Sequence, residues 1–218
     1  MKLADLTERY SFCDPAAGKS RLSRTGARSA VVTVAVDGLG RFFVLEAWAE
    51  RCPTERLIDH IFLTQTRWQA RRVGIEANAM QSVFADTLVL EARRRRLTVP
   101  FLPVRPPSGQ DKLFRIRSIL HPLWATGRIL LQPHQYELRV ELTGFPSAAT
   151  MDLVDAMAYA VALAPPRRIP EQHSAERATL AAYLRRAGVP PLRIEARMRD
   201  FDERQRRPPS FSHARPVA

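Results

Sequence analysis

The hydrophobic pattern of the first 166 residues alternates between short runs typical of strands and longer runs typical of helices. Residues 30–36 are almost continuously apolar and mostly β-branched, which predicts a strand buried on both faces. Residues 37–40 read Asp-Gly-Leu-Gly, a turn that predicts a hairpin with the apolar run 41–48. Further strands are expected at residues 10–14, 72–76, 98–104 and 127–131, and helices at residues 53–69, 80–95, 111–121, 134–142 and 152–163.

This order of elements predicts an α/β fold, in which a mixed sheet begins with an antiparallel three-strand meander and is flanked by helices. From residue 167 onward the chain is rich in Arg and Pro and poor in large apolar residues. We therefore expect one domain over residues 1–166 and a basic C-terminal extension over residues 167–218, with one possible helix at 174–187. The chain has no stretch of 18 apolar residues, which argues against a membrane span.

The charge composition favours an anionic partner. Lys and Arg number 34 against 22 Asp and Glu, a net charge of +12, and only three of the 34 are lysines. The guanidinium fork of arginine pairs well with phosphate oxygens, although GC-rich coding also raises the share of Arg over Lys. The extension at 167–218 holds half of the net charge, with 12 arginines and 6 acids. The two cysteines exclude a disulfide framework and favour a reducing compartment.

Three acids lie at the ends of expected elements. Asp14 ends the first strand, Glu76 ends the fourth, and Asp152 begins the last helix. If the first and fourth strands are parallel neighbours, Asp14 and Glu76 meet at one edge of the sheet, and a helix across the sheet can add the third acid. Such a carboxylate cluster suits Mg²⁺ or Mn²⁺, and two ions about 3.5–4 Å apart can promote phosphodiester cleavage. Taken singly, each acid is also explained as a turn, strand-end or helix-start residue.

The chain carries several short motifs in one order between residues 10 and 163. The motifs are Asp14-Pro15-Ala16, Ile75-Glu76 followed by Gln81, Lys112-x-x-Arg115-Ile116, Leu120-x-Pro122, Gly127-Arg128-Ile129, Glu141-Leu142-x-x-Phe145-Pro146, and the acidic helix start from Asp152 to Asp155. Through these motifs the chain resembles the C-terminal nuclease domain of the large terminase subunit of tailed bacteriophages, which has an RNase H-like fold.

The resemblance implies a metal-dependent DNA endonuclease, a hydrolase that cuts concatemeric viral DNA during genome packaging. It implies that Asp14, Glu76 and Asp152 hold two Mg²⁺ or Mn²⁺ ions and that double-stranded DNA is the substrate. It also implies a phage or prophage protein in the cytoplasm of a bacterial host, working with a packaging ATPase domain, a small terminase subunit and the portal.

Two departures from the family pattern matter. The family usually has His-Asp-Asp before the last helix, and this chain has Thr150-Met151-Asp152. Asp155 lies three residues further along nearly the same helix face, so either aspartate can be the third ligand, with Asp152 the better match. The family also carries a packaging ATPase with a phosphate loop. Here the sequence Gly18-Lys19-Ser20 lacks the glycine such a loop needs five positions earlier, where Cys13 stands.

Lys112 and Arg115 lie three residues apart on one expected helix face. They are either a phosphate contact near the cleavage site or part of a solvated face. Two other functions fit the same acids: another RNase H-like enzyme, such as a Holliday-junction resolvase or an integrase-type transferase, and a non-catalytic DNA-packaging module. A preference for branched DNA would favour the resolvase or transferase, and absence of metal binding would favour the packaging module. The extension after Arg167 is a candidate for contact with DNA or with the portal.

Overall fold

A computed structural model describes residues 6, 8–16, 28–76, 82–105, 109, 111–165 and 170–206 of the chain. The chain divides into two compact units, Met1–Ala164 and Pro165–Ala218. Each unit has its own buried apolar cluster. None of the described helices is long and apolar enough to cross a membrane.

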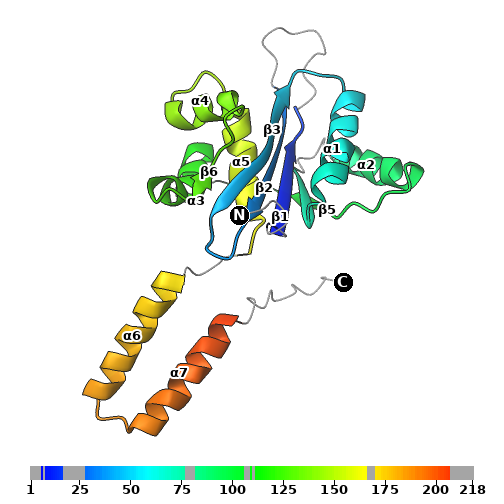
Figure 1. Ribbon diagram of the computed structural model, residues 1–218. Helices are drawn as coiled ribbons and strands as arrows, with labels where there is room; N and C mark the ends of the chain where they lie inside the picture. Colours follow the sequence, from blue (N-terminus) through cyan, green and yellow to red (C-terminus); the bar gives the residue numbers. More distant parts are fainter. Residues whose placement is uncertain are drawn as a thin grey trace. The chain divides into compact units, whose positions relative to one another are not determined.

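A six-stranded mixed sheet forms the centre of the first unit (Figure 1). Its strands are β1 (Glu8–Asp14), β2 (Ser29–Val36), β3 (Phe42–Glu50), β4 (Arg72–Glu76), β5 (Phe101–Val104) and β6 (Ile129–Leu130). The spatial order is β5-β4-β1-β2-β3-β6. Strands β1, β2 and β3 form the expected antiparallel meander, and β4 runs parallel to β1. The proline-containing strand β5 lies at one edge, parallel to β4.

The turn between β2 and β3 is held by an aspartate side chain. One carboxylate oxygen of Asp37 accepts hydrogen bonds from the backbone N–H groups of Leu39 and Arg41, both at 2.9 Å. Gly40 has φ +73°, a left-handed conformation that glycine adopts without steric cost. These contacts fix the hairpin that the Asp-Gly pattern predicts, so β3 returns beside β2.

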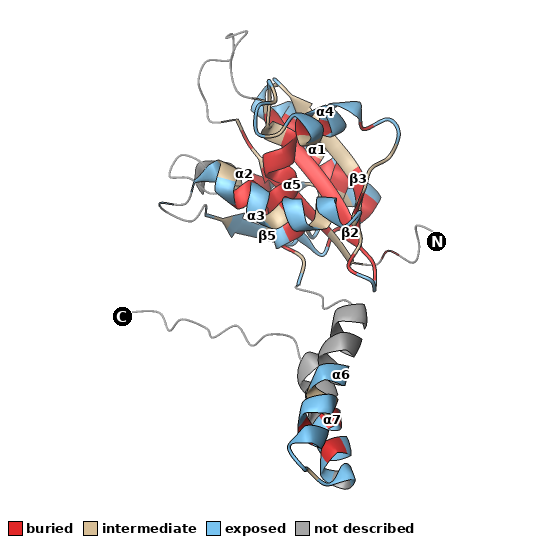
Figure 2. Cartoon of the chain, turned by 90° about the vertical axis from the view of Figure 1, so that its left-hand side faces the viewer, coloured by how far each residue is buried: buried red, intermediate tan, exposed pale blue. Residues whose placement is uncertain are grey.

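Helices cover both faces of the sheet (Figures 1 and 2). Those of the first unit are α1 (Thr54–Trp68), α2 (Ser82–Arg94), α3 (Lys112–Ala125), α4 (Tyr136–Gly144) and α5 (Asp152–Ala162). Side chains on β1 alternate between two cores: Phe12 packs in the cluster with α5, and Cys13 packs in the cluster with α1 and α2. Helix α5 is buried along nearly its whole length, so its apolar face fixes it firmly against the sheet.

The second unit contains two helices, α6 (Pro170–Arg186) and α7 (Pro191–Arg206). Leu184, Ile194 and Met198 form their shared buried cluster. Gly188, with φ +72°, follows α6 and allows the chain to turn toward α7. The sequence pattern indicates one helix, at 174–187. In the structure α6 begins earlier, at Pro170, and a second helix, α7, follows. The apolar pattern of α7 is weak because its two buried residues, at positions 194 and 198, stand among many arginines in the sequence.

Candidate active site

Asp14 and Glu76 lie next to each other where the carboxyl ends of the parallel strands β1 and β4 meet, at one edge of the sheet. Cys13 of β1 pairs with Ile75 of the parallel strand β4, so the next residue of each strand reaches the same edge. Burial, a hydrogen bond with Glu76 and the charge of Glu76 together raise the pKa of Asp14 to about 8. The structure thus brings together the two acids that the strand pattern pairs.

Asp155 is the third acid at this edge. It lies on the first turn of α5 and is only 4% exposed, and its charge also raises the pKa of Asp14. One turn further along α5, the ring of Tyr159 stacks on Phe12 of β1 with ring centroids 4.4 Å apart. This stacking fixes α5 against β1 and so positions Asp155 beside the strand end that carries Asp14.

Two cations neutralise Asp155. Its carboxylate oxygens lie 2.8 Å from Nζ of Lys112 and 2.5 Å from Nη2 of Arg115. Burial lowers the pKa of Lys112, but the hydrogen bond and ion pair with Asp155, helped by the charge of Asp14, outweigh burial and raise the pKa. The ammonium group therefore stays charged beside the acidic pair.

The two expected phosphate contacts differ in exposure. Arg115 is buried, at 8% exposed, and its guanidinium lies over the ring of Tyr159, 4.3 Å from the centroid. The side chain of Lys112 is 48% exposed. Only Lys112 of this pair is in a position to meet a phosphate from solvent, because Arg115 is enclosed by the groups that it binds.

Asp152 is engaged by a different cation. Its carboxylate lies 2.9 Å from Nε of Arg28, and Nη2 of Arg28 lies 2.8 Å from Glu141, which is 2% exposed. Glu141 also accepts the backbone N–H of Val154 at 3.0 Å. Arg28 therefore ties the start of β2 to α4 and to the first turn of α5. Asp152 lies at the margin of the acidic cluster, near enough for its charge to raise the pKa of Lys112.

The sequence left Asp152 and Asp155 open as the third acid and favoured Asp152. The structure places Asp155 against the acidic pair and Asp152 in the Arg28 network. Sequence reasoning assigned no role to Arg28 or Glu141, although Glu141 belongs to one of the quoted motifs. A lone arginine before a strand gives no local signal, because its partners are more than 100 residues away.

Arg105 is a further cation near the acidic pair, and the sequence pattern assigns it no role. It follows Val104 directly, and Val104 pairs with Glu76 in the register of β5 and β4. Arg105 is exposed and forms no ion pair with a carboxylate in the described part of the chain. Its backbone position places a charged side chain at the same sheet edge as the acidic pair.

The donor atoms of Asp14 and Glu76 fit a divalent cation. Carboxylate oxygens are the ligands that Mg²⁺ and Mn²⁺ prefer, and the repulsion within a partly buried pair of acids is relieved by a cation. Over residues 28–76, 82–105 and the other described ranges, no group of three His, Cys, Asp or Glu is arranged as a ligand set. Asp155, the nearest further acid, has its two oxygens on Lys112 and Arg115.

No protein-family model and no curated protein matches the chain. Among solved structures, the P22 large terminase nuclease domain matches with a TM-score of 0.51 and 14% identity, over 73% of this chain and 82% of that one. Thermus thermophilus RuvC with a Holliday junction substrate has a TM-score of 0.40 and 16% identity, over 69% of this chain and 90% of that one. The yeast mitochondrial Holliday junction resolvase Ydc2 has a TM-score of 0.43 and 12% identity, over 71% of this chain and 78% of that one. The chain shares the RNase H-like fold with the P22 large terminase nuclease domain, as the resemblance in its sequence implies.

Proposed function

We propose that the chain is a metal-dependent endonuclease that hydrolyses phosphodiester bonds of double-stranded DNA. The observation that supports this most directly is the partly buried carboxylate pair of Asp14 and Glu76 at the ends of adjacent parallel strands, with a lysine ammonium beside it. Two acids held this close and partly out of water weaken the fold, so their presence in an RNase H-like sheet is best explained by a catalytic use.

Asp14 and Glu76 would hold Mg²⁺ or Mn²⁺, which supplies Lewis-acid polarisation of a phosphoryl oxygen and lowers the pKa of bound water. Lys112 can donate to a non-bridging phosphate oxygen, since its ammonium is charged and reaches solvent. Arg105 can contact a neighbouring phosphate from the same edge. Asp155 is the acid available to a second ion, and it must first exchange its contact with Lys112.

The biological role that we propose is cleavage of concatemeric viral DNA during genome packaging in a bacterial host. It rests on the ordered motifs in the sequence and on the fold shared with a terminase nuclease domain. In that role a packaging ATPase, a small terminase subunit and the portal are the expected partners.

Plasmid cleavage tests the activity. In Mn²⁺ or Mg²⁺ the chain should nick and linearise supercoiled DNA, and Asp14→Asn and Glu76→Gln should each reduce the rate by about a hundredfold or more. Asp86→Asn is the matched control, because Asp86 is exposed on α2. Retained cutting by both site variants would refute the assignment. A four-way junction cut faster than linear duplex would instead indicate a resolvase.

A further inference from the structure

The second unit carries an uneven charge distribution. Over residues 170–206 the α6–α7 pair holds eight arginines and six acids, and the stretch 178–199 holds five of these arginines against a single acid, Glu195. All five arginine side chains are exposed, as is Glu195. The arginines are Arg185, Arg186, Arg193, Arg197 and Arg199.

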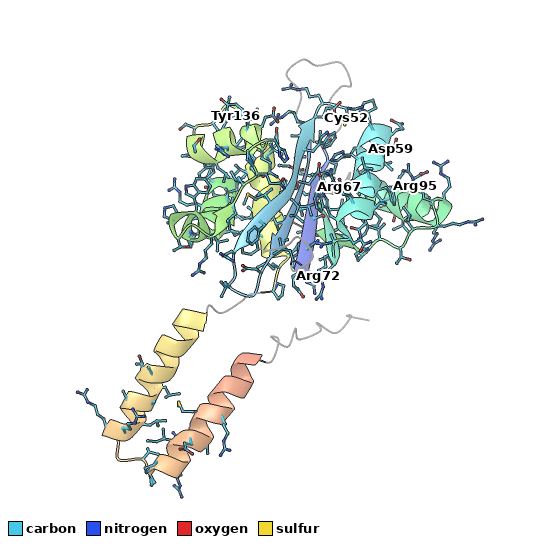
Figure 3. All side chains as sticks on the ribbon, in the orientation of Figure 1. Cys52, Asp59, Arg67, Arg72, Arg95 and Tyr136 are labelled. Atoms are coloured by element: carbon cyan, nitrogen blue, oxygen red, sulfur yellow. The ribbon has the colours of Figure 1, made fainter. Side chains whose placement is uncertain are left out.

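These arginines differ from many of those in the first unit. There, arginines are spread over several elements, as Arg67, Arg72 and Arg95 show in Figure 3, and many are paired. Arg56, for example, lies 2.8 Å from Glu50, and Arg95 contacts both Asp59 and Glu91. None of the five arginines of the hairpin forms an ion pair with a carboxylate of the described residues. Among the described residues, no carboxylate therefore neutralises their charge.

The packing of the hairpin sets where these charges lie. Ile194 and Met198 face Leu184 of α6 and form the buried stripe of α7. Arg193 and Arg197 are one turn apart on one flank of that stripe, about 6 Å along the helix axis. On the other flank, a hollow of about 370 Å³ is lined by residues of both helices: Ala181, Arg185, Ile194, Glu195, Met198 and Arg199.

This arrangement suits an extended polyanion better than a small one. A small anion is held by donors that converge on one point, whereas these arginines occupy both flanks of the hairpin. We propose that the α6–α7 hairpin is a second DNA-binding element that contacts the phosphate backbone of double-stranded DNA without reading its sequence. The choice of DNA as the polyanion rests on the proposed nuclease function. One guanidinium group can donate two parallel hydrogen bonds to one phosphate, which favours arginine over lysine at such a surface.

The test measures DNA binding by the full chain without metal. Fluorescence anisotropy in EDTA gives the affinity for a duplex of about 25 base pairs over a range of KCl concentrations. One variant replaces Arg185, Arg193 and Arg197 with Gln. The control replaces Arg93, Arg117 and Arg139 of the first unit with Gln; these are also exposed and also lack an ion pair with any described carboxylate, so both variants lose three charges.

The hairpin variant should bind at least tenfold more weakly at low salt. The slope of log K against log[KCl] should become shallower by up to about 0.9 per lost phosphate contact, or between two and three in all. Replacing the same three arginines with Lys should restore most of the slope, and circular dichroism should show an unchanged fold. Equal losses in the hairpin and control variants, or no loss in the hairpin variant, would overturn the proposal.

The two proposals fail separately in this design. Asp14→Asn should abolish cutting yet bind DNA as tightly as the unmodified chain, because binding is measured without metal. A chain that binds through the hairpin arginines but never cuts would refute the nuclease function alone. A chain that cuts in an Asp14-dependent way, with binding insensitive to the hairpin arginines, would refute the hairpin proposal alone.

Discussion

The ammonium nitrogen of Lys112 lies 2.8 Å from a carboxylate oxygen of Asp155, beside the partly buried pair of Asp14 and Glu76. The positive charge of Lys112 lowers the pKa of Asp14, against the effects of burial and of the neighbouring acids. A cation of the chain itself therefore supplies part of the compensation that clustered carboxylates require.

Replacing Lys112 should change metal binding and cutting in opposite directions. Lys112→Met removes a positive charge and frees one oxygen of Asp155, so we expect Mn²⁺ to bind about tenfold more tightly or a second ion to bind. Cutting should nevertheless fall, because the proposed phosphate contact is lost. Isothermal titration calorimetry measures affinity and stoichiometry, with Arg117→Gln as the control for general charge. Unchanged Mn²⁺ binding would show that Lys112 does not compete with the metal.

Asparagine substitutions can decide between Asp152 and Asp155. Asp155→Asn leaves the buried Arg115 without a charged partner, so we expect a loss of about 3 kcal/mol in the free energy of unfolding and a loss of cutting. Asp152 is partly exposed and, among the described residues, forms its ion pair with Arg28, so Asp152→Asn should cost about 1 kcal/mol and retain most cutting. Urea unfolding and plasmid cleavage report the two effects. The reverse ranking in the cleavage assay would make Asp152 the third catalytic acid.

The sequence predicts that Asp14 and Glu76 meet, but it leaves open which aspartate of α5 lies against them. Alternation along β1 and β4 and the rule for parallel neighbours are enough to bring Asp14 and Glu76 together. Asp152 and Asp155 lie on nearly the same helix face, and their different positions follow from different partners that are distant in sequence, Arg28 for Asp152 and Arg115 for Asp155.

The burial of Arg115 and the existence of α7 also depend on tertiary contacts. Arg115 and Lys112 share a helix face, and Arg115 is the one enclosed by contacts with Asp155 and Tyr159 of α5. Helix α7 has little apolar surface of its own. Its two buried residues, Ile194 and Met198, can stabilise it only by packing against α6.

Gly74 of β4 has no room for a side chain. A Cβ atom at this position would lie 2.7 Å from a ring carbon of Phe12 and 2.9 Å from Cδ1 of Leu163. Gly74→Ala should therefore displace Phe12, lower the free energy of unfolding by about 1–3 kcal/mol, and reduce cutting through the disturbed stack on Tyr159. Thermal unfolding measures the first effect. Gly38→Ala is the control, since no atom lies within 4 Å of its added Cβ and its effect should be small; equal losses in the two variants would contradict the packing argument.

The turn aspartate Asp37 should make stability depend on pH in the acid range. Burial raises the pKa of Asp37, but hydrogen bonds from Arg41 and Leu39 and the charge of Arg41 outweigh it and hold the pKa below its ordinary value of 3.8. Because the folded pKa is the lower one, the stabilising contribution is complete above the ordinary pKa and is lost as the pH falls through the folded pKa. Asp37→Asn should thus cost about 1 kcal/mol at pH 7, and the difference from the unmodified chain should narrow below pH of about 4.

Urea unfolding at a series of pH values checks this dependence, with Asp86→Asn as the control for loss of an exposed carboxylate. Asparagine keeps an oxygen that can accept hydrogen bonds from the N–H groups of Leu39 and Arg41. The part of the difference in free energy of unfolding that is lost at low pH is therefore due to the charge of Asp37. A difference that stays constant down to pH values near 3 would mean that the shape of the turn, and not the ionised carboxylate and its contact with Arg41, stabilises this hairpin.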